Sequence, residues 1–146
     1  MAGESGRERY EVRLTGSGGQ GLILAGIVLA KAAVYDGLNA VQTQSYGPEA
    51  RGGASRSEVI ISPGEIDYPK VSTPDLLLAM SQEAYDKYGR EVKPGGLVVI
   101  DSDTVGRFDG TDPRTRPVPM TSVARRETGR EITANIVALG VIAALS

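Results

Sequence analysis

One stretch decides the fold of this chain: YEVRLT (Tyr10–Thr15), GSGGQG (Gly16–Gly21) and LILAGIVLAKAAVY (Leu22–Tyr35). In the first segment apolar and polar residues alternate, which is typical of a β-strand. The glycines of the second segment permit a tight turn and let a ligand approach the main chain. The third segment is apolar on all sides, with Lys31 as its only charged residue. It predicts a helix buried on more than one side.

The glycine turn is a natural seat for phosphate, because the N–H groups and the positive dipole end of the following helix point toward it. Gly16, Gly18 and Gly21 form the pattern G-x-G-x-x-G of dinucleotide-binding proteins. That pattern requires an acidic residue at the end of the second strand. Gln44 stands there, and Asp36 falls earlier, in the turn that ends the helix. The anchor for an NAD ribose is therefore missing.

The same turn also matches the outer frame of a phosphate loop, G-x-x-x-x-G-K-[ST]. Leu22 and Ile23 occupy the positions of the lysine and the hydroxyl residue, so nothing holds terminal phosphates or magnesium. Lys31 cannot substitute, since it lies roughly 15 Å along the helix at about 1.5 Å per residue. Nucleotide hydrolysis is excluded. The plainer alternative is that the glycines only form a strand-to-helix turn.

Composition narrows the function classes further. The 146 residues suit one domain with its own core. With 16 basic and 18 acidic residues, no general attraction to nucleic acid or membranes is expected. The chain has no cysteine and no histidine, which excludes thiol nucleophiles, imidazole bases, cysteine-ligated iron–sulfur clusters and typical zinc sites. Lack of cysteine fits a reducing cytoplasm. Residues 1–9 are polar and predict a loose, disordered tail without a signal peptide.

Strands alternate with helices along the chain, and two strands are wholly apolar. This order predicts a three-layer α/β/α domain with a mixed, largely parallel sheet. Further strands are predicted at 39–44, 54–61, 76–80 and 97–100, with short strands at 66–68 (a hairpin partner) and 117–119; helices are predicted at 82–90 after a Ser81 cap, at 121–128 with Thr121 as cap, and at 134–145.

Four loops are expected to share one edge of this sheet. Gly16–Gly21, Ser45–Gly53, Ser81–Gln82 and Asp101–Ser102 each follow a strand. In such sheets ligands collect at the carboxyl ends of the strands. This edge is therefore the predicted functional site.

The sequence of these loops resembles a known family. Thr15–Gly21 (TGSGGQG), Gln42–Gly53 (QTQSYGPEARGG), Pro74–Asp75 and Ala79–Tyr85 (AMSQEAY) closely resemble the gamma subunit of the 2-oxoacid:ferredoxin (acceptor) oxidoreductases. The 2-oxoglutarate branch is the most similar. The two glycine-containing loops are specific together, and the resemblance is strong over residues 10–105.

Two departures from the family accompany this resemblance. Ser55 stands where family members commonly carry a cysteine. Further helical sequence commonly follows the segment that corresponds to 134–145. We therefore expect residues 10–146 to form a single gamma-type domain without the family's C-terminal extension.

The resemblance implies a division of labour among subunits. Thiamine diphosphate and Mg²⁺ belong to the alpha and beta subunits, and iron–sulfur clusters to beta or a ferredoxin-like delta subunit. The gamma chain packs against alpha, and its glycine loop faces coenzyme A (CoA). The whole complex converts a 2-oxoacid and CoA to acyl-CoA, CO₂ and reduced ferredoxin. The gamma chain itself supplies no catalytic residue and no metal ligand.

Two loops supply the candidate CoA-binding residues. Three of these residues also have a simpler structural role. Arg51 could form an ion pair with Glu49, Tyr46 could pack within its own loop, and Gln20 could cap backbone groups. The arginines between Arg107 and Arg130 form a solvated face or meet the 3′-phosphate of CoA. The candidates are Gly16, Ser17, Gly18, Gly19, Gln20 and Gly21 in the first loop and Tyr46, Arg51, Gly52 and Gly53 in the second.

The two apolar helices predict association. The segments 22–34 and 134–145 cannot both be covered by one small sheet layer, so we expect a homodimer or a complex with an alpha-type chain. Gly26 is expected to permit close helix packing, and Lys31 to lie at the surface or in an interface. The alternative functions are an accessory subunit of an indolepyruvate-type oxidoreductase and a free-standing nucleotide-binding or regulatory domain.

Overall fold

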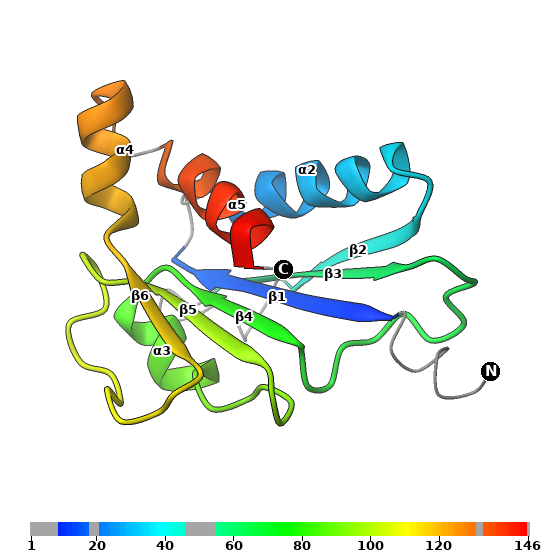
Figure 1. Cartoon of the computed structure of the whole chain (residues 1–146), viewed down its shortest axis with the longest axis horizontal. Coiled ribbons are helices and arrows are strands. Elements are labelled where there is room, and N and C mark those ends of the chain that lie inside the picture. The colour runs from blue at the N-terminus through cyan, green and yellow to red at the C-terminus, as the bar shows by residue number, and fades with distance from the viewer. Residues whose placement is uncertain (1–8, 18–20, 46–54, 131–132, 146) are drawn as a thin grey trace.

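The computed structural model describes residues 9–17, 21–45, 55–130 and 133–145. These segments contain six strands and four helices (Figure 1). The strands are β1 (Tyr10–Gly16), β2 (Asn39–Ser45), β3 (Ser55–Ser62), β4 (Leu76–Ala79), β5 (Leu97–Asp101) and β6 (Thr115–Val118); the helices are α2 (Leu22–Tyr35), α3 (Gln82–Tyr88), α4 (Met120–Thr128) and α5 (Ala134–Leu145).

All six strands form one mixed sheet in the order β2-β3-β1-β4-β5-β6. From β1 to β6 the neighbouring strands are parallel, whereas β3 is antiparallel to both β1 and β2. The predicted hairpin strand at 66–68 is wrong, because those residues form no strand. Since β3 already pairs with β1 along one side and β2 along the other, no edge of β3 is left for a hairpin partner.

Helices cover both faces of the sheet, as the three-layer prediction required (Figure 1). On one face α2, α4 and α5 pack against side chains such as Leu14 and Leu78 in one apolar cluster. On the other face α3 packs through Ala84 and Tyr88 against Leu77 and its neighbours. The fully apolar strands β4 and β5 lie in the middle of this sandwich, where both faces are buried.

Helix α2 lies close to β2 and β3 because of Gly26. A Cβ atom at this position would clash with Ser57 Oγ and would come within 3.4 Å of Gln42 Cγ. The prediction that Gly26 permits close packing is thereby confirmed. Glycine in a helix interior costs roughly 1 kcal/mol relative to alanine, and here the cost is offset by the close approach of helix and sheet.

Two sequence predictions at the ends of elements need correction. Arg9, assigned to a loose tail, pairs with Glu11 at 2.9 Å and donates hydrogen bonds to the carbonyl oxygens of Tyr68 and Lys70. Thr121 was predicted to cap α4, but the helix begins one residue earlier, at Met120. The N-terminus of this helix is capped instead by the carboxylate of Asp101, at the end of β5.

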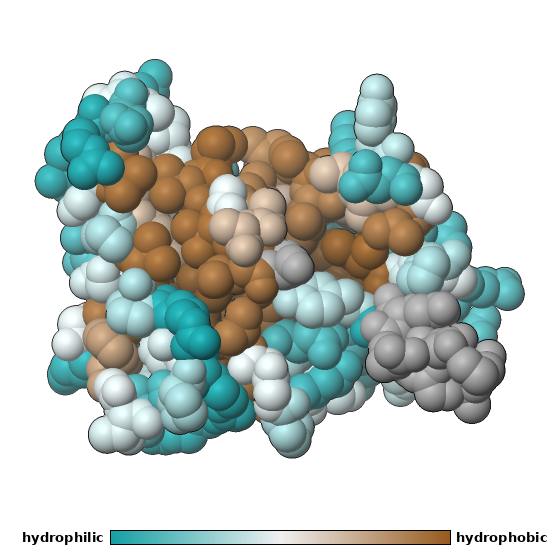
Figure 2. Space-filling view, viewed as in Figure 1, coloured by the Kyte–Doolittle hydropathy of each residue, from teal (hydrophilic) through white to brown (hydrophobic). Residues whose placement is uncertain are grey.

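The outer surfaces of α2 and α5 are unusually apolar. Hydrophobic side chains gather over these two helices in the space-filling view (Figure 2). Leu24, Val28 and Val34 of α2 and Ile136 of α5 are each more than 40% exposed. None of the described helices is long and apolar enough to cross a membrane, and such patches mark interaction surfaces.

Candidate functional site

The glycine turn lies where β1 passes into α2. Gly21, at the N-cap of α2, has a φ of 71°, a left-handed conformation that favours glycine. Its carbonyl oxygen accepts the first helical hydrogen bond, from Ala25 N at 3.0 Å. Of the candidate residues in this loop, Gly16, Ser17 and Gly21 are described, and Gly18, Gly19 and Gln20 lie outside the described residues.

A crevice is expected beside this turn, because the helices that follow two adjacent parallel strands leave on opposite faces. β1 pairs in parallel with β4, with Thr15 opposite Ala79 at their carboxyl ends. The helix after β1, α2, belongs to one face, and the helix after β4, α3, belongs to the other. In open α/β sheets this switch point is where ligands bind. The glycine turn therefore borders the place in the fold that is best suited to a ligand.

The N-terminus of α2 is suited to an anion. Its N-cap residue is Gly21, which has no side chain to cap it, and its first turn contains no acidic residue. The first N–H groups of a helix have no partner within the helix and carry the positive end of its dipole. A phosphate or pyrophosphate group would accept hydrogen bonds from these N–H groups, and its negative charge would be stabilised by the dipole.

The second predicted loop begins and ends at the same edge. In the sheet, Gly16 pairs with Ser55, and Ser45 pairs with Arg56. Ser55 Oγ donates a hydrogen bond to Gly16 O at 3.3 Å, so the end of this loop is tied directly to the glycine turn. The candidate residues within the loop, Tyr46, Arg51, Gly52 and Gly53, lie outside the described residues.

Asn135 is a residue at this site that sequence reasoning did not select. It lies in the first turn of α5, is 7% exposed, and donates a hydrogen bond from Nδ2 to Gly21 O at 3.3 Å. Its signal in the sequence was its isolation, as the single polar side chain in the apolar helix 134–145. The C-terminal helix thus contacts the residue from which α2 starts.

Ser81 and Gln82 follow β4 and so lie at the same edge of the sheet as the glycine turn, as predicted. Ser81 Oγ accepts a hydrogen bond from Ala84 N at 3.1 Å and caps α3, which confirms the predicted cap. Gln82 Oε1 accepts a hydrogen bond from Arg107 N at 2.9 Å. Gln82 Nε2 donates hydrogen bonds to Arg107 O at 2.7 Å and to Asp86 Oδ1 at 2.9 Å. Gln82 therefore fixes the loop after β5.

Asp101, at the end of β5, has a structural role that the sequence did not reveal. This fully buried carboxylate accepts hydrogen bonds from Thr121 Oγ1 at 2.6 Å and from Met120 N at 3.1 Å. It caps α4 across the sheet edge, because carboxylates are stabilised at helix N-termini. Asp103 bonds the N–H and hydroxyl of Ser122 in the same way.

Arg56 brings a positive charge to the α3 side of this edge. Its guanidinium lies over the ring of Tyr88, 5.7 Å from the centroid, and its Nε is 3.9 Å from Glu58 Oε2. Glu58 already binds Arg13 Nε at 2.7 Å. Arg56 is therefore only weakly compensated by this carboxylate, and it is the second residue of β3, the strand that follows the second loop.

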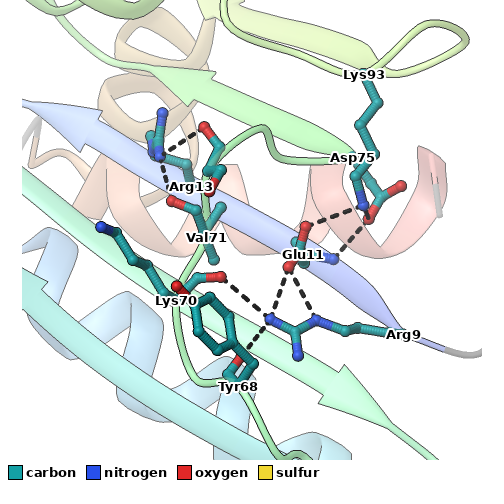
Figure 3. Close-up of polar contacts among 9 residues, drawn as sticks. Arg9, Glu11, Arg13, Tyr68, Lys70, Val71, Asp75 and Lys93 are labelled. Atoms are coloured by element: carbon teal, nitrogen blue, oxygen red, sulfur yellow. Dashed lines mark hydrogen bonds and ion pairs between the residues drawn. The ribbon is translucent and has the colours of Figure 1, made fainter.

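A second cluster of charges lies at the opposite, amino end of the sheet (Figure 3). Lys93 Nζ is 2.9 Å from Glu11 and 3.3 Å from Asp75. Burial acts to lower the pKa of Lys93, but the hydrogen bonds and charges of Glu11 and Asp75 outweigh it and raise the pKa. Burial and the Asp75 charge raise the pKa of Tyr10. The cluster fastens β1 to the 68–75 segment and to Lys93, away from the crevice.

The described segments contain no set of side chains that could bind a metal ion. Within them, no group of three or more histidine, cysteine, aspartate or glutamate residues is placed to hold a metal ion. The backbone N–H groups, hydroxyls and guanidinium that the described edge offers are groups that can bind anions.

Residues 11–146 match the family of pyruvate ferredoxin/flavodoxin oxidoreductases. The chain belongs to this family. The 2-oxoglutarate synthase subunit KorC of Methanocaldococcus jannaschii is 52% identical to it over 141 residues, which cover 94% of this chain and 75% of the relative.

Two solved structures extend the likeness. The gamma subunit of keto/oxoacid ferredoxin oxidoreductase from Geobacter sulfurreducens is 52% identical with a TM-score of 0.84, covering 94% of this chain and 76% of that one. The 2-oxoglutarate:ferredoxin oxidoreductase from Magnetococcus marinus, solved with 2-oxoglutarate, coenzyme A and succinyl-CoA bound, is 28% identical with a TM-score of 0.80, covering 91% of this chain and 23% of that one.

The predicted family and fold are thereby confirmed. The chain is a gamma subunit of a 2-oxoacid:ferredoxin oxidoreductase and has the three-layer architecture of its relatives. Membership in a family of enzyme subunits decides against a free-standing regulatory domain. The individual contacts of the gamma subunit with CoA and with its partners remain predictions.

Proposed function

We propose that this gamma subunit binds CoA at the crevice between the carboxyl ends of β1 and β4. The observation that carries the proposal is the N-terminus of α2, which has glycine at its N-cap and follows the glycine turn at the point where α2 and α3 leave on opposite faces. The pyrophosphate of CoA matches this site, since backbone N–H groups and the helix dipole both favour a negative charge. The bound CoA of the Magnetococcus relative supports the choice of ligand.

The second loop is proposed to complete the site. It leaves the sheet after Ser45 and returns at Ser55, which is bonded to Gly16. Tyr46, Arg51, Gly52 and Gly53 belong to this loop, so they are well placed along the chain to contact the same ligand. Arg51 would supply the positive charge that a phosphate prefers.

The chemistry of the reaction belongs to other subunits in this proposal. The complex would convert 2-oxoglutarate and CoA to succinyl-CoA, CO₂ and reduced ferredoxin, in the cytoplasm. A chain without cysteine or histidine suits a role in binding and assembly, with thiamine diphosphate, Mg²⁺ and iron–sulfur clusters on alpha, beta or a delta subunit. The apolar surfaces of α2 and α5 would serve for assembly with alpha, and in isolation for a homodimer.

The test compares Gly18→Val with Ser17→Ala in the reconstituted complex. A branched side chain at Gly18 blocks the approach of a ligand to the main chain and disfavours positive φ, so the KM for CoA should rise at least tenfold. Ser17→Ala keeps the backbone and should change it less than threefold. Size-exclusion chromatography checks that both variants assemble. If Gly18→Val assembles normally and its CoA dependence is unchanged, the loop is only a turn and the proposal fails.

Arg51→Ala examines the second loop independently. We expect a higher KM for CoA while decarboxylation of the 2-oxoacid, followed as CO₂ release without CoA, is retained. The isolated gamma chain should neither retain thiamine diphosphate nor oxidise a 2-oxoacid. Turnover by the isolated chain with CoA and ferredoxin would contradict the division of labour.

A further inference from the structure

Asn135 is the one polar residue of α5, and it is buried. The helix is otherwise composed of alanine, glycine and branched apolar residues, and the Asn135 side chain is at a position that is only 7% exposed. An amide group in such a place costs free energy unless its polar atoms are hydrogen-bonded. An apolar side chain would avoid this cost. Packing alone therefore does not account for an asparagine at this position.

Two neighbours on the same helix fix the place of Asn135. Ala138 and Ile142 follow it by three and seven residues, so all three lie on one face of α5, and all three are buried. Ala138 and Ile142 pack in one apolar cluster with Ala25 of α2, and α5 lies beside α2 (Figure 1). The amide of Asn135 is thereby held at the start of α2, where Nδ2 donates to Gly21 O at 3.3 Å.

This hydrogen bond acts on a peptide group that faces the proposed CoA site. The carbonyl of Gly21 and the N–H of Leu22 belong to one planar trans peptide group, so they point in opposite directions. Gly21 O points into the helix, since it accepts from Ala25 N at 3.0 Å. The Leu22 N–H therefore points out of the N-terminus of α2, among the N–H groups that have no partner within the helix. A side chain that holds Gly21 O also aims the Leu22 N–H.

The peptide group between Gly21 and Leu22 needs such support. Glycine leaves the backbone a wide range of conformations, and the ends of helices fray. The bond from Ala25 belongs to the end that frays, whereas Asn135 belongs to a different helix. A donor on the carbonyl oxygen also polarises the peptide group and strengthens its N–H as a donor. Asn135 thus both orients the Leu22 N–H and favours its bond to an anion.

We propose that Asn135 is a positioning residue for CoA, which holds the Leu22 N–H toward the pyrophosphate by donating to Gly21 O. The inference rests on the proposed CoA site and assigns to it a residue of the last described helix. Asn135 acts through the peptide group of Gly21 and Leu22 and not by touching the ligand. Its loss should weaken the binding of CoA and leave the chemical steps on the partner subunits unchanged.

The test measures KM for CoA and kcat in the reconstituted complex. Asn135→Ala removes the donor and should raise KM about fivefold, the effect of one hydrogen bond, while kcat stays within about twofold of the wild-type value. Gly129→Ala is the matched control, because it strains the backbone at another positive φ, of 76°, where a Cβ atom would meet nothing within 4 Å. It should lower the stability of the subunit by a similar amount, which urea denaturation checks, and leave KM unchanged.

Equal effects of the two variants would contradict the proposal. If Gly129→Ala raises KM for CoA as much as Asn135→Ala does, the cause is lost stability and Asn135 has no positioning role. Asn135→Asp covers the case in which alanine impairs assembly. It keeps the size of the side chain, but an ionised carboxylate cannot donate to Gly21 O. It should raise KM at least as much as Asn135→Ala.

Pantetheine supplies a second readout, because it carries the thiol of CoA without the pyrophosphate. Asn135→Ala should lower kcat/KM for CoA about fivefold and leave kcat/KM for pantetheine within about twofold of the wild-type value. An equal loss with both acceptors would show that Asn135 does not act on the pyrophosphate, and would overturn the proposal.

Gly18→Val separates a failure of this inference from a failure of the CoA site. If Gly18→Val raises KM for CoA while the two Asn135 variants keep the wild-type KM, the site stands and the positioning role of Asn135 is refuted. If Gly18→Val also leaves KM unchanged, the site itself is refuted, and the inference with it.

Discussion

Asn135 donates a hydrogen bond to the carbonyl oxygen of Gly21 at 3.3 Å and joins two positions that are 114 residues apart. The two residues are closely packed, since a Cβ atom at Gly21 would lie 2.5 Å from Asn135 Nδ2. It fastens the first turn of α5 to the start of α2. The position of the proposed CoA site therefore depends on the last helix of the described chain as well as on the glycine turn.

This contact predicts a non-additive pair of substitutions. Gly21→Ala should destabilise the protein by about 2 kcal/mol, from strain at positive φ and from the clash with Asn135. Asn135→Ala should cost about 1 kcal/mol for the lost hydrogen bond. In the double variant the clash is absent, so the cost should be smaller than the sum. Urea denaturation of the three variants measures the coupling.

Gly129 supplies the control for backbone strain. It also has positive φ, at 76°, but a Cβ atom there would meet nothing within 4 Å. Gly129→Ala should therefore cost only about 1 kcal/mol, and Asn135→Ala should not change that cost. If the destabilisation of the Gly21→Ala, Asn135→Ala double variant equals the sum of the two single variants, the contact between these residues does not contribute to stability.

A second prediction concerns the cap of α4. Asp101→Ala removes a buried carboxylate that accepts from Met120 N and from the Thr121 hydroxyl, and should cost about 3 kcal/mol. Asp103→Ala removes an exposed cap on Ser122 and should cost about 0.5–1 kcal/mol. Thermal unfolding gives both values, and hydrogen exchange should show the amides of α4 opening first in the Asp101 variant. Equal costs for the two substitutions would contradict the assigned roles.

Much of the fold could be predicted because local patterns agreed with it. The helix Leu22–Tyr35 and the helix Ala134–Leu145 begin and end where the sequence indicated, since both are continuous apolar runs bounded by turns or polar residues. The apolar strands β4 and β5 were found for the same reason. The loops at their carboxyl ends share an edge because parallel strands point the same way.

What could not be predicted depends on contacts between distant segments. Nothing local shows that Asp101 caps α4, because its partner Thr121 lies 20 residues later; the sequence instead suggested Thr121 as its own cap. The strand wrongly predicted at 66–68 rested on Ile66 and Tyr68, which alternate with Asp67 after a turn. The sequence does not show that β3 is already paired on both sides. Asn135 was visible as an exception but not as a neighbour of Gly21.

A third prediction follows from the raised pKa values of Lys93 and Tyr10. A group whose pKa is higher in the folded state stabilises the fold below its unfolded pKa and loses this effect as pH rises through the folded pKa. Both groups have unfolded pKa values near 10. The free energy of unfolding should therefore change little between pH 7 and 9 and fall above about pH 10.

Variants separate the two contributions to this alkaline loss. Lys93→Met should lower stability at pH 8 and make the decline above about pH 10 shallower, because Glu11 and Asp75 lose their partner at every pH. Tyr10→Phe should also make the decline shallower. Lys70→Met, at an exposed lysine, is the control and should leave the profile unchanged. A Lys93 variant with the wild-type slope would refute the assignment.

The last prediction concerns the distance between α2 and the sheet. Gly26→Ala improves helix propensity by about 1 kcal/mol, but its Cβ would clash with Ser57 Oγ, and Ser57 is fully buried. Overpacking of this kind costs about 1–3 kcal/mol, so the net effect should be destabilising. Gly140, in the middle of α5, is the control, because a Cβ atom added there would meet nothing within 4 Å. Gly140→Ala should stabilise the protein by about 0.5–1 kcal/mol.

Ser57→Ala turns this comparison into a test of mechanism. Removing Oγ opens the space that the new methyl group needs, while Gln42 Nε2 keeps its hydrogen bond to Gln44 Oε1 at 3.0 Å. The double variant Gly26→Ala, Ser57→Ala should therefore regain most of the stability that Gly26→Ala loses. Chemical denaturation measures the recovery. If Gly26→Ala is as stabilising as Gly140→Ala, α2 does not need glycine to approach β2 and β3. The distance between α2 and the sheet would then be determined by other contacts.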